Sequence, residues 1–188
     1  MLIDRTVTDL LDAFASPDPT PGGGSAAALT GALGASLLAM VAGMPKAKTT
    51  EDEPRAALAA ARTRLLDARA TLLTLIDRDS AAYDGVVAAY RRPKDTDADK
   101  AARKAAIQQA LRLATEVPLE TATRCSDAIR DGATVEAYGN PNASSDVGTG
   151  LALLRAGLHG ALLNVEVNLG ALTDADLVAA IRQRMAEL

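Results

Sequence analysis

The run of small, uncharged residues PGGGSAAALTGALGASLLAM at positions 21–40 constrains the fold of this chain more than any other stretch. Alanine favours helix, but such short side chains bury little area each. A helix of this kind therefore gains stability only where neighbouring backbones come close. Hydrophobic residues make up 48% of the chain and aromatic residues only 2%. We therefore expect an aliphatic core of closely packed helices, with few residues that favour strands.

Apolar residues recur at helical spacing through most of the chain. The predicted fold class is all-α, an array of long helices, bundle-like, in a single domain that covers residues 1–188. Pro118 is expected to kink or divide a helix, and Thr173 is expected to cap the last one. The predicted helices cover residues 6–15, 24–43, 54–90, 96–114, 119–138, 145–169 and 174–187.

Composition excludes several classes of protein. The net charge of −4 argues against a nucleic-acid binder. A single cysteine, Cys125, leaves no internal disulfide and indicates a reducing compartment, and one histidine, His159, excludes His-rich zinc sites. The uncharged window 25–44 is long enough to span a bilayer, but its Ala, Gly, Ser and Thr content favours a core helix. We expect a cytoplasmic protein without a bound metal and without membrane partners.

The glycines before the small-residue helix have two interpretations. Gly22, Gly23, Gly24 and Ser25 lack the Gly-Lys-Ser/Thr ending of a phosphate loop and the preceding strand of a dinucleotide fold. They form either a loop that crosses close to other backbone, which the residues alone favour, or a helix start whose free N–H groups receive a polar or anionic group.

Asp79 lies on the apolar face of the long third helix. With Ile76 at zero and 100° per residue, Asp79 falls at about −60°, inside an arc of apolar residues, whereas Asp77 falls at about +100°, at its edge. A carboxylate among apolar side chains is partly desolvated, which raises its pKa toward a value suited to proton transfer. The alternative is a buried carboxylate paired for structural reasons, and the helical pattern does not separate the two.

Two pairs of asparagines are candidates for polar contacts. Asn140 and Asn142 flank a proline in the strongest predicted turn, and Asn164 and Asn168 lie four apart on one helix face. Buried amides must be hydrogen-bonded, either to backbone across a tight helix contact or to a ligand, and periodicity favours the contact. Asp146 in the first turn of its helix is typical of a charge that complements the helix dipole.

Basic residues form two small groups. One contains Lys46 and Lys48, and the other contains Arg91, Arg92 and Lys94. Each is either a solvated surface or a site for an acidic ligand.

Four stretches resemble one family, in order along nearly the whole chain. PTPGGGSAAALTGALGASLLAMVAG at 19–43 resembles the signature of the cyclodeaminase/cyclohydrolase family, and LIDRDSAAYDGVVAAYRRPKDT at 75–96 resembles its D-x-x-A-F/Y segment. ALRLATEVPLE at 110–120 is similar to its A-x-x-V-P helix. YGNPNASSDVG at 138–148, followed by LNVEVNL at 163–169, is similar to its G-N-x-N-x-x-S-D and N-V-x-I-N-L pair.

This resemblance implies an all-helical homodimer that binds folates in a groove which the subunits help to form, without a metal or redox cofactor. It implies either hydrolysis of 5,10-methenyltetrahydrofolate to 10-formyltetrahydrofolate or cyclisation of 5-formiminotetrahydrofolate with loss of ammonia. Asp79 is then the expected catalytic carboxylate and Asp146 a second acid. The expected substrate-binding residues are Gly22, Gly23, Gly24, Ser25, Lys46, Lys48, Tyr83, Asn140, Asn142 and Asn168.

One segment departs from the family pattern. Family members often carry a Leu-Thr-x-Gly-Lys-Lys-x-Tyr run after the glycine helix, whereas this chain has GMPKAKT at 43–49. Lys46 and Lys48 stand for the two lysines, but the aromatic residue and the flexible glycine of that run are missing. A homologue that binds folate without catalysis therefore stays an alternative beside the two enzymes.

Overall fold

The computed structural model of the chain describes residues 1–44 and 47–188, and every regular element in these ranges is a helix. The predicted all-α class is therefore confirmed. The long helices are α2 (Gly23–Ala42), α3 (Asp52–Tyr90), α4 (Asp97–Tyr138) and α5 (Ser144–Leu169). The short elements are η1 (Leu2–Asp4), α1 (Val7–Ala15), η2 (Pro141–Ala143) and α6 (Ala175–Ala186).

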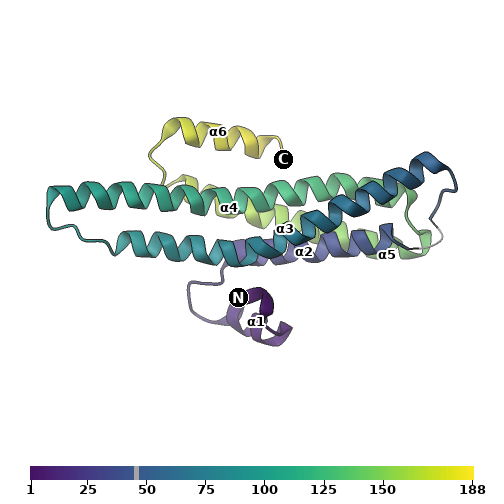
Figure 1. The fold of residues 1–188 in the computed structure, drawn as a ribbon, viewed down its shortest axis with the longest axis horizontal. Coiled ribbons are helices and arrows are strands. Elements are labelled where there is room, and N and C mark those ends of the chain that lie inside the picture. Colours follow the sequence, from purple (N-terminus) through teal and green to yellow (C-terminus); the bar gives the residue numbers. More distant parts are fainter. Residues whose placement is uncertain (45–46) are drawn as a thin grey trace.

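The four long helices form a bundle in which α2 packs mainly against α3 and α5, and α4 packs against α3 and α5. Figure 1 shows that α3 and α4 run on together past the beginning of α2, so that one end of the molecule is a two-helix projection. We call residues 80–110, which contain this projection, the arm. Helices α1 and α6 lie on opposite sides of the bundle (Figure 1).

Small residues let α2 and α5 approach closely, as the sequence predicts. A Cβ added at Gly34 would lie 2.7 Å from the carbonyl oxygen of Gly150, and one added at Gly157 would lie 2.9 Å from the carbonyl oxygen of Ala27. Cys125 fills the neighbouring gap, because a Cβ at Gly31 would lie 2.6 Å from its sulfur. Burial raises the pKa of the Cys125 thiol to about 12, so this residue acts as a small apolar side chain.

α2 is also long and apolar enough to cross a membrane. Within the bundle, however, most of its apolar window is buried between the other helices. This burial is what a core helix shows, and it agrees with the interpretation of the small-residue composition.

The prediction that Pro118 divides its helix into two segments is wrong, because α4 is one helix of 42 residues with Pro118 inside. A proline has no N–H, so the carbonyl of Ala114, four residues earlier, loses its helical partner. The side chain of Asn168 on α5 replaces that partner and donates to the Ala114 oxygen at 2.7 Å. The helix continues because a distant amide satisfies the freed carbonyl.

The last helix is capped by a different residue from the one expected. Asp174 is the N-cap of α6, and its carboxylate accepts from the Leu177 N–H at 3.0 Å. Thr173 instead donates from its N–H and its hydroxyl to the Gln108 side chain, at 2.9 and 3.0 Å. These bonds tie the linker before α6 to α4.

The contact between α2 and α5 predicts opposite effects for two Gly→Ala substitutions. Gly34→Ala places a methyl group against α5 backbone, so we expect the free energy of unfolding to fall by about 1–3 kcal/mol. Gly148→Ala, also in a helix but with open space around it, should raise that free energy by about 0.5–1 kcal/mol, because alanine is the better helix former. Urea denaturation of both variants measures the difference, and shifts of the same sign and size would contradict close packing at Gly34.

Candidate functional site

Asp79, half-buried on α3, meets the N-terminal end of α2 at Gly24 and Ser25, which are both buried. Its Oδ2 lies 3.0 Å from the Ser25 hydroxyl oxygen. A Cβ added at Gly24 would lie 2.6 Å from the Asp79 carboxyl carbon. Only a residue without a side chain fits there, so Gly24 is what lets the carboxylate reach the helix start.

The surroundings of Asp79 destabilise the ionised form of its carboxyl more than they stabilise it. Burial raises the pKa of this carboxyl, and hydrogen bonds from the hydroxyl and the backbone N–H of Ser25 act in the opposite direction, with the larger effect from burial. The N-cap of α2, Gly22, has no capping side chain. The first N–H groups of α2 therefore depend on Asp79, solvent or a ligand for partners.

Ser25 suits both protonation states of Asp79. Its hydroxyl is fully buried, 2.9 Å from the Ile76 carbonyl oxygen and 3.1 Å from the Ser80 hydroxyl oxygen. When Asp79 is ionised, Ser25 can donate to the carboxylate. When Asp79 is protonated, the acid can donate to Ser25, which then donates to Ile76. The site can thus hold or release one proton without leaving a buried group unpaired.

Tyr83 and two asparagines extend this corner. Tyr83 lies one turn after Asp79 and is 44% exposed. On the other side of the helix start, Asn164 donates to the Gly160 carbonyl oxygen at 2.8 Å, and a Cβ at Gly23 would lie 3.3 Å from its amide nitrogen. Asn168, one turn further along α5, is occupied on its nitrogen by the backbone of α4. Thus Asn164, omitted from the expected binding residues, is nearer to the glycines than Asn168; its four-residue spacing from Gly160 was the available signal.

The remaining predicted residues lie at the other end of α2. Gly139, which begins the turn after α4, packs beside Val41, where an added Cβ would be 3.1 Å from Val41 Cγ1. Since α2 has 20 residues, its two ends are about 30 Å apart at 1.5 Å per residue. Within one chain, the structure therefore does not bring this turn to Asp79.

This far-end cluster contains Lys48, Asn140, Asn142 and Asp146. The Lys48 ammonium donates to the Glu136 carbonyl oxygen at 2.6 Å, and the side-chain oxygen of Asn140 accepts from the Asn142 N–H at 2.9 Å. Lys48 and Asn140 line a small cavity of about 170 Å³. Asp146 is half-buried in the first turn of α5, and Lys46 lies outside the described residues.

A larger groove of about 780 Å³ lies between α3 and α4 along the arm, on a different face of α3 from Asp79. Alanine is the commonest residue in its walls, and its charges include Arg112 and Glu116, which pair with each other at 2.8 Å. It contains no desolvated acid or base. The corner at Asp79 is therefore the better candidate for chemistry.

The described part of the chain holds no cluster of side chains that commonly bind metal ions. No group of three or more His, Cys, Asp or Glu side chains there is arranged to hold a metal ion. The chemistry that the corner itself offers is proton transfer by Asp79, next to backbone N–H groups and amide side chains.

An all-helical bundle with a desolvated carboxylate at a glycine-rich helix start defines a class of acid–base sites, and the comparisons place the chain within a family. A sequence model described as "Formiminotransferase-cyclodeaminase" matches residues 6–187. The chain belongs to this family.

Relatives in the family carry two names. The methenyltetrahydrofolate cyclohydrolase of Methylorubrum extorquens is 42% identical over 98% of this chain and 88% of its own length. The formimidoyltransferase-cyclodeaminase of Sus scrofa is 34% identical over the whole chain, which spans only 35% of that larger protein. The crystal structure of a formiminotetrahydrofolate cyclodeaminase from Thermotoga maritima shares the fold with a TM-score of 0.87, covering 100% of this chain and 89% of that one at 24% identity.

The raised pKa of Asp79 predicts a pH-dependent stability difference. Between the carboxyl's unfolded pKa and its higher folded pKa, the native state binds more protons than the unfolded state, so wild-type stability falls as pH rises through this window. Asp79→Asn stays neutral and avoids that loss. We therefore expect the free energy of unfolding of the variant, relative to wild type, to increase from pH 3 to pH 7. Urea titrations at several pH values test this. Asp84→Asn, an exposed site on the same helix, controls for general charge; an equal increase there would contradict the assignment.

Proposed function

We propose that this protein is a methenyltetrahydrofolate cyclohydrolase, which hydrolyses 5,10-methenyltetrahydrofolate to 10-formyltetrahydrofolate. The observation that carries the proposal is the Asp79 carboxylate, desolvated against the glycine start of α2. The 42% identity to a cyclohydrolase over nearly the whole chain supports this activity above others in the family. We place the enzyme in the cytoplasm, without a resident cofactor and without membrane or nucleic-acid partners.

The proposed reaction needs one base beside a cation. The methenyl bridge between N5 and N10 carries a delocalised positive charge, which a neighbouring carboxylate stabilises. Water adds to the bridge carbon while Asp79 accepts one of its two protons. The bond from that carbon to N5 then breaks as the new hydroxyl oxygen becomes the formyl oxygen, and the proton lost from this hydroxyl is balanced by the one that N5 gains. The proton on Asp79 is released to solvent. The formyl group remains on N10. Ser25, bonded to Asp79 at 3.0 Å, keeps the carboxyl oriented in both protonation states.

The other residues of the corner supply recognition in this proposal. Backbone N–H groups at Gly22, Gly23 and Gly24 approach the substrate without side chains in the way, and Tyr83 offers an aromatic face. Asn168 has its amide nitrogen bound to Ala114, so only its oxygen is offered to the pterin ring.

The far-end cluster contributes to catalysis only across a subunit interface. Lys48, Asn140, Asn142 and Asp146 are too far from Asp79 in one chain for a folate to touch both groups. We propose a homodimer in which the far end of α2 in one protomer lies against the beginning of α2 in its partner. Support comes from apolar side chains on the outer faces of α2 and α5 that would be covered there: Leu33, Met40, Leu163 and Val167, which are 53%, 42%, 55% and 78% exposed.

Cyclisation of formiminotetrahydrofolate with release of ammonia is the second candidate. It is favoured by the 34% identity to a bifunctional formimidoyltransferase-cyclodeaminase. The same carboxylate would serve it, because ring closure also passes through charge on the bridge nitrogens. A folate-binding homologue without activity is the third, prompted by the altered lysine segment at 43–49.

Replacement of the proposed base should remove most turnover. We expect Asp79→Asn to lower kcat by about 10²- to 10⁴-fold, the usual contribution of a positioned base. The loss of the near-ultraviolet absorbance of methenyltetrahydrofolate measures hydrolysis, and the appearance of the same band from formiminotetrahydrofolate measures cyclisation. Asp77→Asn is the matched control, because Asp77 accepts from the Leu2 N–H at 2.6 Å and makes no contact with Ser25. Wild-type rates in Asp79→Asn would exclude the assignment, and folate binding without either absorbance change would support the inactive homologue.

The dimer gives a separate prediction. Leu33→Glu combined with Met40→Glu puts charge on the outer face of α2, where burial in an interface would be costly. We expect this variant to be monomeric by light scattering and to lose turnover along with the partner's far-end cluster. Leu66→Glu, at an exposed leucine on α3, should leave the dimer intact. A monomeric wild-type protein with full activity would rule out the shared site.

A further inference from the structure

An exposed aromatic stripe continues from Asp79 along α3. Tyr83, Val86 and Tyr90 lie within about 60° of one another and of Asp79 around the helix axis, at 100° per residue. Leu72 on the same face is fully buried. Tyr83 and Tyr90, by contrast, are 44% and 49% exposed. The change occurs because α2, which packs on α3, begins at Gly23, beside Asp79, and leaves the arm beyond it uncovered (Figure 1).

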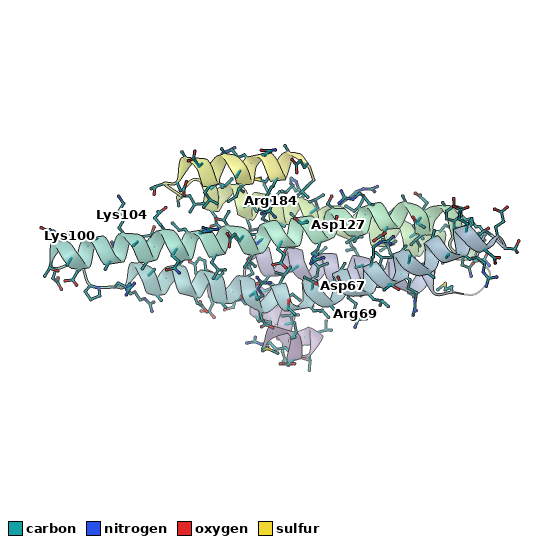
Figure 2. The ribbon with its side chains drawn as sticks, turned by 45° about the horizontal axis from the view of Figure 1, so that its top comes forward. Asp67, Arg69, Lys100, Lys104, Asp127 and Arg184 are labelled. Atoms are coloured by element: carbon teal, nitrogen blue, oxygen red, sulfur yellow. The ribbon has the colours of Figure 1, made fainter. Side chains whose placement is uncertain are left out.

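The stripe leads to a basic pocket at the tip of the arm. This pocket, of about 300 Å³, is lined by Lys94, Lys100, Arg103, Lys104, Ile107 and Gln108. Arg103 links it to the stripe: the guanidinium donates to the Tyr90 carbonyl oxygen at 3.0 and 3.1 Å, and its carbon lies 5.6 Å from the centre of the Tyr90 ring. Figure 2 shows Lys100 and Lys104 at this end of α4.

Two of the pocket's cations are available for a ligand. Lys100 is paired with Asp97 at 2.8 Å, and Arg103 is committed to Tyr90. Lys94 and Lys104 are exposed and have no hydrogen-bond or ion-pair partner in the part of the chain that the structure describes. A ligand with one or two carboxylates would add the anions that this pocket lacks.

We propose that the stripe and the basic pocket bind the p-aminobenzoyl-glutamate part of the folate substrate. The ring lies on Tyr83 and Tyr90, and the glutamate carboxylates reach Lys94 and Lys104. This assignment rests on the proposed function, since it takes the bridge carbon to be at Asp79. It also places the acidic end of the substrate away from Lys46 and Lys48, two of the substrate-binding residues that the family resemblance implies.

The dimensions agree with this placement. Tyr90 lies eleven residues after Asp79 on one helix, which is about 16 Å at 1.5 Å per residue. The substrate's bridge carbon is separated from its carboxylates by a benzoyl ring, an amide and the glutamate chain, roughly the length of four extended residues or about 14 Å. Lysine side chains at the tip span the remainder. Lys48 is about 30 Å away near the opposite end of α2, beyond the reach of a folate held at Asp79 of the same chain.

Kinetics with a shortened substrate test the tail site. We expect Lys94→Gln combined with Lys104→Gln to raise the KM for methenyltetrahydrofolate about tenfold with little change in kcat, and to weaken the salt dependence of KM. With methenyltetrahydropteroate, which lacks the glutamate, wild type and variant should have equal KM values. The control variant combines Arg69→Gln with Arg155→Gln, which removes the same charge at exposed positions elsewhere. It should leave the KM for both substrates unchanged.

Three results would overturn the tail site. The first is an equal rise in KM for both substrates in the arm variant, because a defect in folding or catalysis would not depend on the glutamate. The second is a glutamate-dependent rise in KM in the Lys48→Gln variant with no such rise in the arm variant, because the tail would then lie at the far end of α2. The third is an unchanged KM for both substrates in the arm variant.

A binding measurement separates this inference from the proposed activity. If the wild type turns over neither folate, the proposed function fails, and calorimetry with p-aminobenzoyl-glutamate then tests the arm alone. Binding by wild type that the arm variant weakens about tenfold supports the tail site without any turnover. Absence of binding to the wild type, or equal binding to both proteins, overturns it.

Discussion

The contact between the glycine start of α2 and the Asp79 carboxylate joins the fold to its chemistry. α2 can approach α5 closely because glycines such as Gly34 lie at the contact, and its first turn can reach α3 only because residue 24 has no Cβ. The place where α2 begins then fixes two features at once. On the side of Asp79 that α2 covers, the face of α3 that carries Leu72 is buried. On the other side, toward the arm, the same face of α3 is exposed to solvent.

Asp79 sits at the boundary between these two environments, and its position accounts for its unusual balance. The apolar side removes water from the carboxylate, and Ser25 and the helix N–H groups give back only part of that solvation. A group held in this way costs the folded protein stability at neutral pH. Such a cost is typical of residues kept for reactivity rather than for structure, whereas the Arg64–Asp131 pair between α3 and α4 shows the opposite, supportive arrangement.

Local pattern predicted much of this. The limits of α2, α3 and α5 follow from periodicity, capping residues and turn residues, and the position of Asp79 among apolar side chains follows from helical angles alone. Pro118 shows where local pattern fails: the sequence around it predicts a break, and the compensating hydrogen bond comes from Asn168, 54 residues after the Ala114 carbonyl that it satisfies. The same bond shows why the sequence leaves two roles open for Asn168, since an amide that satisfies backbone and one that binds a heterocycle have the same signature in sequence.

The predicted site residues divide between the two ends of α2 for a geometric reason. The glycines and Asp79 lie at the beginning of α2, whereas Lys48 and the turn after α4 lie at its end. The length of α2 separates the two groups by about 30 Å. At the far end, Lys48 donates to Glu136 in the last turn of α4, where carbonyls lack helical partners, so a structural role accounts for it within one chain. Residues at that end can contribute to a site at Asp79 only if a second chain brings them close to it. The arm, in contrast, extends from Asp79 on the same helix and needs no partner to place its lysines at the distance that a folate spans.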